Sequence, residues 1–417
     1  MRYSNRLFSN LIDSNYTGNY YAFISAIESF INDFSIVFDC IREDDIDKVE
    51  NIWDSNFRLP SIVFEFQLSI DQKNLLMGDG PITEYLETWV FLRTSETTQV
   101  PYGEAFVNGI LVSSLIVIET IRTRQRFEGN DGIIIERLRG QYTLENLERS
   151  NEIEIGNVLN RQIEEYFNVN VYYVGQGNCS AICNGNNQPL IYFDVGGGSN
   201  FNRHTYPQGF TLCHTNFPPI ILSHWDEDHC MLGLIQMRSL RHKWIAPASA
   251  NIRPSVQPIA RTLYNRGNLL LWPNGLPAIN FHYGTIEKCN GLTPNDSGLV
   301  LFVHYNGYSI LLPGDCGYNE IINLNNYRLT GLVARHHGAR DTLIAIPQAF
   351  RNGKIAYSFG CVNYYNHPNR DSIRAHDQAG WRNKRGTPVG NITFAPEPNI
   401  CSTPCGHQCR LQIVQNF

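Results

Sequence analysis

Short apolar runs, each ended by a polar or glycine-rich turn, recur through the second half of the chain. They occupy 169–174, 180–183, 189–193, 219–222, 332–334 and 355–359. Runs of this length between turn residues predict strands. Two more runs, 299–304 and 308–312, flank Asn306-Gly307, a dipeptide typical of a two-residue hairpin turn. The region is therefore expected to be a layered α/β structure or a sandwich of two sheets.

The first part of the chain has a less regular pattern. Apolar residues at three- and four-residue spacing predict helices at 25–34 and 46–53, while alternation at 61–68 predicts a strand. The apolar run 107–122 is expected to be a buried helix, although its β-branched residues leave a strand as the alternative. Residues 144–167 are rich in Glu and Leu and are expected to form a helical connector.

A length of 417 residues favours two domains. We expect an accessory domain of mixed α/β character at 1–165 and a second domain at 166–417. The first contains 14 Lys and Arg against 27 Asp and Glu, a formal charge of −13, and the second contains 19 against 12, a charge of +7. A basic domain attracts polyanions, and the acidic one would suit a protein partner. A chance distribution of charge is an equal alternative.

The sequence suggests neither a secretory signal nor a membrane-spanning segment. Residues 1–16 contain no continuous apolar run, so no secretory signal is expected, and the longest apolar stretch, 110–121, is shorter than a membrane span. These features predict a cytoplasmic protein without a membrane partner. The 11 cysteines are therefore expected to be thiols or metal ligands rather than a disulfide framework.

The strongest chemical signal follows the run 219–222. Within six positions the chain supplies His224, Asp226, Asp228 and His229. Carboxylate oxygens and imidazole nitrogens together suit Zn²⁺, Mn²⁺ or iron. A tight turn would aim successive side chains to different sides, so this one segment could serve two metal ions.

These residues resemble the metal-binding motif of metallo-β-lactamase-fold hydrolases. Ser223-His224-Trp225-Asp226-Glu227-Asp228-His229 has Asp226 where the second His usually stands, which is the form found in the hydrolase domain of ComEC-like competence proteins. Other family segments follow in the same order: Tyr173–Cys179, Ile191–Gly196, Asn295–Ser297, Leu311–Asp315, Val333–Gly338 and Ser358–Pro368. The resemblance extends from about residue 168 to 417. Ala339 stands where that family has Ser.

The resemblance implies an αββα sandwich that holds two divalent ions, with zinc or manganese favoured. It implies a metal site made of His224, Asp226, Asp228, His229, Asp315 and either His336 or His337. Asp228 and His229 would hold one ion, and His224 and Asp226 would contribute to the other. Asp315 would bridge both ions.

Three points about the ligand set remain open in the sequence. Either His336 or His337 would complete a metal shell. Asp194 would orient a ligand histidine through a hydrogen bond rather than bind metal itself. The family's usual histidine between the first motif and Asp315 has no clear counterpart, because His282 and His304 are both expected to belong to strands.

The implied reaction is hydrolysis by a water that two metal ions activate. Ions about 3.5–4 Å apart lower the pKa of a shared water and supply hydroxide near neutral pH. Asp226 or Asp228 would accept the proton, and His367 would donate one to the leaving oxygen or bind a phosphate. A plain turn residue before Pro368 is the alternative for His367.

A basic segment near the end favours a nucleic-acid or nucleotide substrate. Residues 335–385 contain nine Lys and Arg against three Asp, with Tyr364, Tyr365 and Trp381 among them. Cations that bind phosphate and rings that stack on bases are what a single strand requires. Within the segment, Arg340, Asn363 and Arg370 are expected to bind substrate. A solvated basic face over core aromatics is an equal alternative.

The sequence therefore predicts a metal-dependent hydrolase, with a phosphodiesterase or nuclease favoured. The alternatives are a hydrolase of a small phosphorylcholine- or lactone-type ester and a non-catalytic binding protein with a structural metal. ComEC-like proteins carry a membrane channel that this chain lacks, so the resemblance implies a soluble relative, many of which are bacterial. One further candidate zinc site consists of Cys401, Cys405, His407 and Cys409, and reduced thiols are the alternative for these cysteines.

Overall fold

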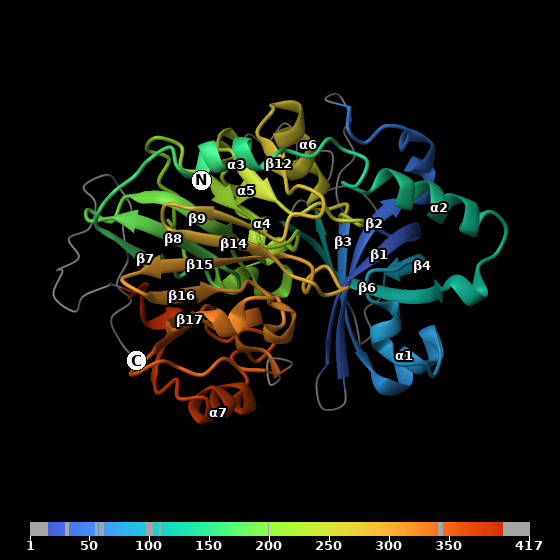
Figure 1. The fold of residues 1–417 in the computed structure, drawn as a ribbon. Coiled ribbons are helices and arrows are strands. Elements are labelled where there is room, and N and C mark those ends of the chain that lie inside the picture. The colour runs from blue at the N-terminus through green and yellow to red at the C-terminus, as the bar shows by residue number, and fades with distance from the viewer. Residues whose placement is uncertain are drawn as a thin grey trace. The chain divides into compact units, whose positions relative to one another are not determined.

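The computed structural model describes residues 16–29, 33–54, 57, 62–96, 103–107, 110–198, 200–340 and 345–394. The chain divides into two compact units, coloured along the sequence in Figure 1. The first comprises Met1–Leu144 with Ala250–Arg261, and the second comprises Glu145–Ser249 with Thr262–Phe417. The boundary expected after residue 165 thus falls inside the second unit.

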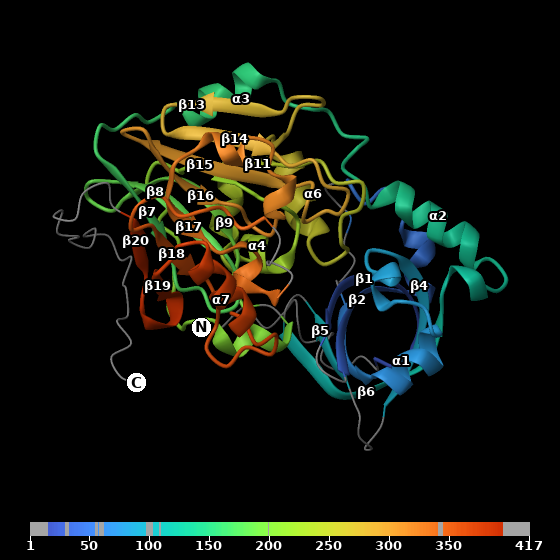
Figure 2. The same cartoon turned by 60° about the horizontal axis from the view of Figure 1, so that its bottom comes forward.

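The first unit is built on a closed barrel with strand order β1-β2-β3-β5-β6-β4, in which all neighbours are antiparallel. Its strands are β1 (Gly18–Ser29), β2 (Asp33–Arg42), β3 (Ile62–Ser69), β4 (Trp89–Glu96), β5 (Gly103–Val107) and β6 (Ile110–Arg122). The helices α1 (Ile70–Met77) and α2 (Asp131–Gln141) accompany it. Figure 2 shows the barrel end-on.

Residues 20–25 of β1 and 35–41 of β2 are buried on both faces of the barrel wall, which hides the strand period there. In β1, Tyr20, Ala22 and Ile24 belong to the barrel core, and Tyr21 and Phe23 on the other face are buried as well. A strand covered on both sides reads as a continuous apolar run without alternation.

Several expectations for the first part of the chain were wrong. The helix expected at 25–34 falls on β1 and β2, apart from residues that lie outside the described ranges. Within the run 107–122, Val107 ends β5 and residues 110–122 form β6 rather than a helix, as the β-branched alternative predicted. At 46–53 only a 3-10 turn, η1 (Glu43–Lys48), overlaps the expected helix. The strand expected at 61–68 is confirmed by β3.

A short segment from the middle of the chain completes the first unit. Residues 250–261 lie against the barrel, where the Ser255 amide donates a hydrogen bond to Asp39 Oδ1 over 3.1 Å and Gln257 Nε2 donates to the Ile52 carbonyl over 2.6 Å. Burial raises the pKa of Asp39. Because an isolated buried carboxylate is costly, the hydrogen bond from Ser255 helps this barrel residue to stay inside.

The second unit contains two seven-stranded sheets. The first sheet has the order β12-β11-β10-β9-β8-β7-β20. Its strands are β7 (Phe167–Val171), β8 (Cys179–Asn184), β9 (Pro189–Val195), β10 (Ile220–Ile221), β11 (Trp244–Ala246), β12 (Leu269–Leu271) and β20 (Ile392–Phe394). Strands β9 to β12 pair in parallel and the others are antiparallel.

The second sheet has the order β13-β14-β15-β16-β17-β18-β19. Its strands are β13 (Ala278–Phe281), β14 (Gly284–Lys288), β15 (Leu299–Tyr305), β16 (Tyr308–Leu312), β17 (Leu329–Val333), β18 (Lys354–Tyr357) and β19 (Asn383–Gly386). Strands β16 to β19 pair in parallel. The hairpin expected around Asn306-Gly307 is confirmed, with Tyr305 opposite Tyr308.

One hydrophobic cluster joins residues of both sheets, such as Phe193 of the first and Leu301 of the second. A separate cluster contains β15 to β18 residues together with Trp381 and Ala379. The helices of this unit are short: α3 (Glu152–Leu159), α4 (Glu227–Cys230), α5 (Leu232–Ile235) and α7 (Arg370–Gln378), while α6 (Gln257–Asn265) begins in the first unit and ends in the second. Only α3 lies within the helix expected at 144–167.

The predicted fold class, an αββα sandwich preceded by a mixed α/β domain, was therefore wrong. The structure is rich in sheet, with a closed antiparallel barrel and two further sheets. The physical reason is that an apolar run taken for a helix pairs with other strands of the barrel, as β6 does with β4 and β5, and local spacing does not reveal such partners. Within the described ranges, no helix is both long enough and apolar enough to cross a bilayer.

One cysteine pair departs from the expected thiols. Cys289, directly after β14, and Cys316 form a disulfide. The other cysteines in the described part of the chain carry free thiols: Cys40, Cys179, Cys183, Cys213 and Cys230, all buried, and the exposed Cys361. The predicted zinc ligands Cys401, Cys405, His407 and Cys409 lie outside the described residues.

Candidate metal centre

The candidate site collects residues from the carboxyl ends of parallel strands in both sheets of the second unit. Asp194 lies at the end of β9, and His224 follows β10. Asp315 follows β16, and His336 and His337 follow β17. Parallel neighbours end at the same edge of a sheet, which is why residues distant in sequence meet there.

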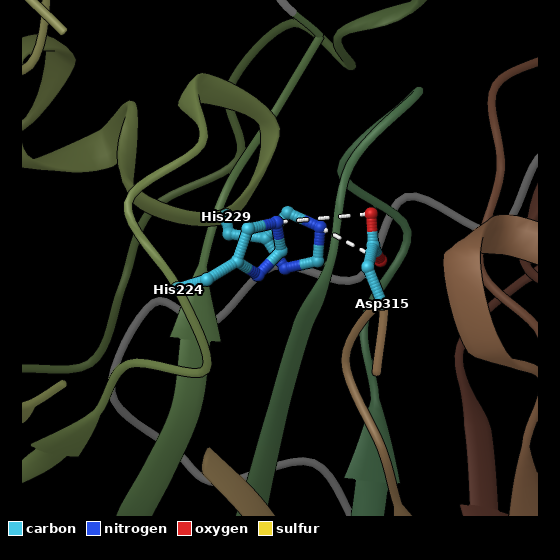
Figure 3. Close-up of side chains that lie close together, drawn as sticks. All are labelled: His224, His229 and Asp315. Carbon is cyan, nitrogen blue, oxygen red and sulfur yellow. Dashed lines mark ion pairs between the residues drawn. The ribbon is translucent and has the colours of Figure 1, made fainter. Parts of the chain in front are cut away.

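Three of the predicted ligands form a buried cluster, shown in Figure 3. His229 Nε2 lies 3.1 Å from Asp315 Oδ1, and His224 Nε2 lies 3.8 Å from Asp315 Oδ2. The three ligand atoms that this group offers all lie within 4.8 Å of one another. Such a spacing would accommodate one cation between them.

The same atoms lack other partners. Among the described residues, His224 Nε2, His229 Nε2 and Asp315 Oδ1 are buried without a hydrogen-bond partner. Buried polar atoms are normally satisfied, and leaving three unsatisfied side by side is costly. The donor set therefore fits a bound metal ion.

A second group of potential ligands adjoins the first. His337 Nε2 lies 3.0 Å from Asp228 Oδ2, and His229 Nε2 lies 3.8 Å from Asp228 Oδ1. Asp228, His229 and His337 also offer atoms within 4.8 Å of one another. His229 belongs to both groups but offers only one ring nitrogen. Two ions could therefore not both bind His229, and each would use a different part of the ligand set.

The hydrogen bonds behind the histidines fix which ring nitrogen faces the cluster. Ser223 Oγ donates to Asp194 Oδ2 over 2.9 Å and so accepts from His224 Nδ1 over 3.0 Å. His229 Nδ1 donates to Asp194 Oδ2 over 2.8 Å, and His337 Nδ1 donates to the Ser358 carbonyl over 2.7 Å. Once Nε2 gives up its proton, each of these rings therefore presents an Nε2 lone pair, as metal ligands do.

Asp194 lies behind the ligand atoms. Besides its bond to His229, its Oδ1 accepts a hydrogen bond from the Ser223 amide over 2.7 Å. The residue is fully buried and has a left-handed φ of 57°. This strained backbone aims one carboxylate at both ends of the segment from Ser223 to His229.

The charges of the cluster hold one another in place. Burial disfavours ionisation, but the attraction of His229 keeps the pKa values of Asp228 and Asp315 below their ordinary range. Burial likewise opposes a charged His229, yet Asp315, Asp194 and Asp228 raise its pKa well above the usual value. The negative charge of the carboxylates therefore has to be balanced by a cation. A bound metal ion can balance it in place of the proton on His229.

The two histidines after β17 differ in their surroundings. Both have left-handed backbones, with φ of 45° at His336 and 55° at His337. His337 is buried and belongs to a group that fits an ion. His336 is more exposed, and its Nε2 lies 3.6 Å from Asp315 Oδ2. His337 is therefore the better candidate for a ligand.

Asp226 lies at the edge of the cluster. Its Oδ2 is 3.5 Å from His224 Nε2, and its carbonyl accepts the first hydrogen bonds of α4. His282 and His304, the two candidates for the family's missing histidine, do not join it. His282 lies in an exposed turn, and His304 in β15 bonds to Thr285 and Ser309.

The predicted substrate residues have mixed positions. His367 is buried, with its ring centroid 5.6 Å from that of His336 and 6.0 Å from that of His337. Asn363 is also buried and bonds to the backbone of His367, so it supports that loop. Arg340 and Arg370 lie exposed on the surface.

The basic segment is not one open surface. Trp381 is fully buried and its Nε1 donates to the Pro347 carbonyl, so it belongs to the core. Arg335 is buried and Lys384 pairs with Asp377. Tyr364 is the aromatic residue of this segment with an exposed face, at 45%.

Sequence reasoning missed a buried network beneath Asp315. The Arg335 guanidinium donates to the Asp315 carbonyl over 2.9 Å, and the Arg335 amide donates to Tyr318 Oη over 3.3 Å. Tyr318 in turn donates to His376 Nε2 over 3.1 Å. Arg335 could have been suspected from its place directly before His336, whereas no local pattern indicates Tyr318 or His376.

This network makes stability depend on pH. Burial lowers the pKa of His376 from 6.5 to about 4. Between these two pKa values the unfolded chain binds a proton that the folded chain does not. The contribution of His376 to the free energy of unfolding is therefore fully present above the unfolded pKa, and it is lost as the pH falls through the folded pKa. The expected slope from this one residue is about 1.4 kcal/mol per pH unit.

Urea unfolding of metal-free protein, followed from neutral pH down to about pH 4.5, would measure this slope. A His376→Gln variant is expected to lose stability less steeply than the parent protein. Replacement of the exposed His282 by Gln is the matched control and should keep the parent slope. Identical slopes for all three proteins would contradict a buried, neutral His376.

Comparison with known proteins gives no assignment. No protein-family model matches the chain, and no curated protein matches it significantly.

Proposed function

We propose that the protein is a metal-dependent hydrolase that cleaves phosphodiester bonds in nucleic acids or nucleotides. The observation that carries this proposal is the convergence of three buried ligand atoms, on His224, His229 and Asp315, that have no other hydrogen-bond partner among the described residues. The resemblance of residues 223–229 to the motif of ComEC-like hydrolases supports the same chemistry.

The donor set favours zinc or manganese. It combines imidazole nitrogens with carboxylate oxygens, the ligands these ions share in hydrolases. When bound, such an ion lowers the pKa of a water molecule and offsets charge that develops on a phosphoryl oxygen. His224, His229 and Asp315 would hold one ion, and Asp228 and His337 would serve a second.

The chain's own residues would position the reactants. Asp194 and Ser223 hold the rings of His224 and His229 through hydrogen bonds. Asp228 is bonded to His337, and its pKa is held low by His229. Asp226, partly exposed at the edge of the cluster, is therefore the better placed acceptor for a proton from the attacking water.

The preference for a phosphodiester rests on charge and on the loop that carries His367. The part of the chain from residue 166 onwards has a formal charge of +7. The loop also exposes Val362 and Tyr364, at 90% and 45%, next to Asn363 and His367. An exposed ring on the loop that carries His367 suits a nucleotide base, because every base offers a face for stacking.

Hydrolysis assays test this proposal directly. Bis(p-nitrophenyl) phosphate and labelled single-stranded DNA and RNA would be incubated with the protein and Mn²⁺ or Zn²⁺. Cleavage is expected, and it should be lost in the Asp228→Ala, His229→Ala double variant but kept in Asp371→Asn, which removes a surface acid on α7. The proposal fails if the metal-loaded protein cleaves none of these substrates, or if the double variant cleaves as well as the parent.

A further inference from the structure

Gln176 contacts His367 across 191 positions of sequence. Its Nε2 lies 3.1 Å from His367 Nδ1, and both side chains are buried. Gln176 lies in the glycine turn after β7, and His367 lies in the loop after β18. The contact therefore joins the two sheets of the second unit beside the metal histidines.

The orientation of the Gln176 amide follows from its other partner. Gln176 Oε1 accepts a hydrogen bond from the Gly360 amide over 3.4 Å. The flipped amide would set its NH₂ group against that N–H donor, so the observed orientation is the one the network permits. The group that faces His367 is consequently a donor.

His367 must then accept at Nδ1, and its neutral ring carries the proton on Nε2. This is the opposite of His224, His229 and His337, whose Nδ1 atoms donate and whose Nε2 atoms would present lone pairs to a bound metal ion. The tautomer separates His367 from the ligands. An Nε2–H group cannot bind a metal ion, but it can donate to an oxygen atom.

The position of the ring suits that role. Its centroid lies 5.6 Å from that of His336 and 6.0 Å from that of His337, to which it is nearly parallel. Asn363 holds the loop by accepting from the His367 amide over 2.9 Å and donating to its carbonyl over 2.7 Å. The loop is thus fixed at both its backbone and its ring.

Gln176 is itself firmly held. Its backbone N–H group donates to Thr205 Oγ1 over 2.8 Å. A Cβ atom at Gly360 would lie 2.7 Å from the Gln176 nitrogen, so only glycine allows this approach of the two loops. These two contacts hold the Gln176 backbone in place, so that its side chain lies next to His367.

From this geometry we infer that Gln176 keeps His367 as a hydrogen-bond donor to a non-bridging oxygen of the substrate's phosphoryl group. His367 would contact substrate, and Gln176 is a positioning residue that acts through it. The inference rests on the proposed function and sharpens it. A neutral ring held in this form binds and stabilises a phosphoryl oxygen, whereas it is a poor proton donor to the leaving group, since loss of its only N–H proton would leave an anionic ring.

Two phosphodiesters that differ in leaving group distinguish these roles. The assay compares a p-nitrophenyl ester with an alkyl ester of the same nucleotide, using the metal-loaded protein. His367→Ala is expected to lower kcat about 100-fold on both esters, as loss of one such donor does elsewhere. Gln176→Met should lower it about 10-fold on both. Losses that grow with the basicity of the leaving group would overturn the inference, since they indicate proton donation.

A double variant tests whether Gln176 acts through His367. Gln176→Met is expected to cause little further loss in the His367→Ala background. Additive losses would indicate an independent structural role and would overturn the inference. Gln188→Met, at a turn residue after β8, is the matched control and should behave as the parent protein. Gln176→Leu provides a second variant, and metal content and thermal midpoint are measured for each.

Two measurements do not depend on turnover. Inorganic phosphate, titrated calorimetrically into the metal-loaded protein, should bind at least about 10-fold more weakly to His367→Ala and to Gln176→Met. Nitrogen-15 correlation spectra of histidine-labelled, zinc-loaded protein should show an unprotonated Nδ1 for the ring whose signal disappears in His367→Ala. A protonated Nδ1 would overturn the inference. Normal phosphate binding by the parent without any phosphodiester cleavage would instead refute the proposed function alone.

Discussion

Replacement of Asp315 by Asn is expected to remove metal binding and hydrolysis together. The residue is 2% exposed, and its carboxylate lies 3.1 Å from His229 and 3.8 Å from His224. The amide has nearly the same shape but no charge, so the remaining histidines would lose their common acidic partner. Replacing a residue that only hydrogen-bonds to a metal ligand already lowers metal affinity or activity by about 10- to 100-fold. Replacing a direct ligand should lower them by more than about 100-fold.

Metal content after dialysis and hydrolysis of bis(p-nitrophenyl) phosphate would measure this effect. Asp371→Asn is the matched control, because it makes the same chemical change at an acid whose side chain is 45% exposed on α7. The control should keep the parent's metal content and rate. Full metal retention in Asp315→Asn would show that the ion binds elsewhere.

The second large effect is expected from a single methyl group at Gly196. This glycine follows β9, and a Cβ atom there would lie 1.6 Å from the carbonyl oxygen of Asp228 and 2.8 Å from the His229 nitrogen. Backbone atoms cannot be moved aside as a flexible side chain can, so Gly196→Ala should displace the segment that carries both residues. The expected cost is about 3 kcal/mol of stability or more, the upper range for overpacking, together with loss of metal binding.

Thermal or urea unfolding and metal content would test this expectation. Gly185→Ala is the control, because a Cβ atom at Gly185, in the turn after β8, meets no atom within 4 Å. That variant should be as stable as the parent or slightly more stable. If Gly196→Ala retains both stability and metal, the close approach of β9 to the His224–His229 segment is not required for the site.

The local sequence determined the elements that short-range chemistry controls. The hairpin at Asn306-Gly307 follows from a turn that these two residues favour, and the strand at 62–69 follows from visible alternation. The segment His224–His229 could be singled out because its ligand-type side chains are neighbours in the sequence. Asp315, His336 and His337 could be added through the resemblance, and the structure brings them to the same cluster.

Tertiary structure decided what depends on partners distant in sequence. The run 110–122 is a strand because it pairs with β4 and β5 in the barrel, which its local sequence does not reveal, and the predicted fold class was wrong. Trp381 resembled a stacking residue in the sequence, but it is covered on all sides by the core. Burial is a property of the whole packed chain and cannot be read from a residue's neighbours.

The roles of the histidines were decided at the same level. The sequence offered His336 and His337 as equivalents and left His367 between two roles. Two hydrogen bonds distinguish them, one from His337 Nδ1 to the Ser358 carbonyl and one from Gln176 Nε2 to His367 Nδ1, over separations of 21 and 191 residues. An imidazole is a lone-pair ligand or an N–H donor according to what its other nitrogen bonds. For this protein that second partner is supplied by another strand end, which only the folded chain brings into contact.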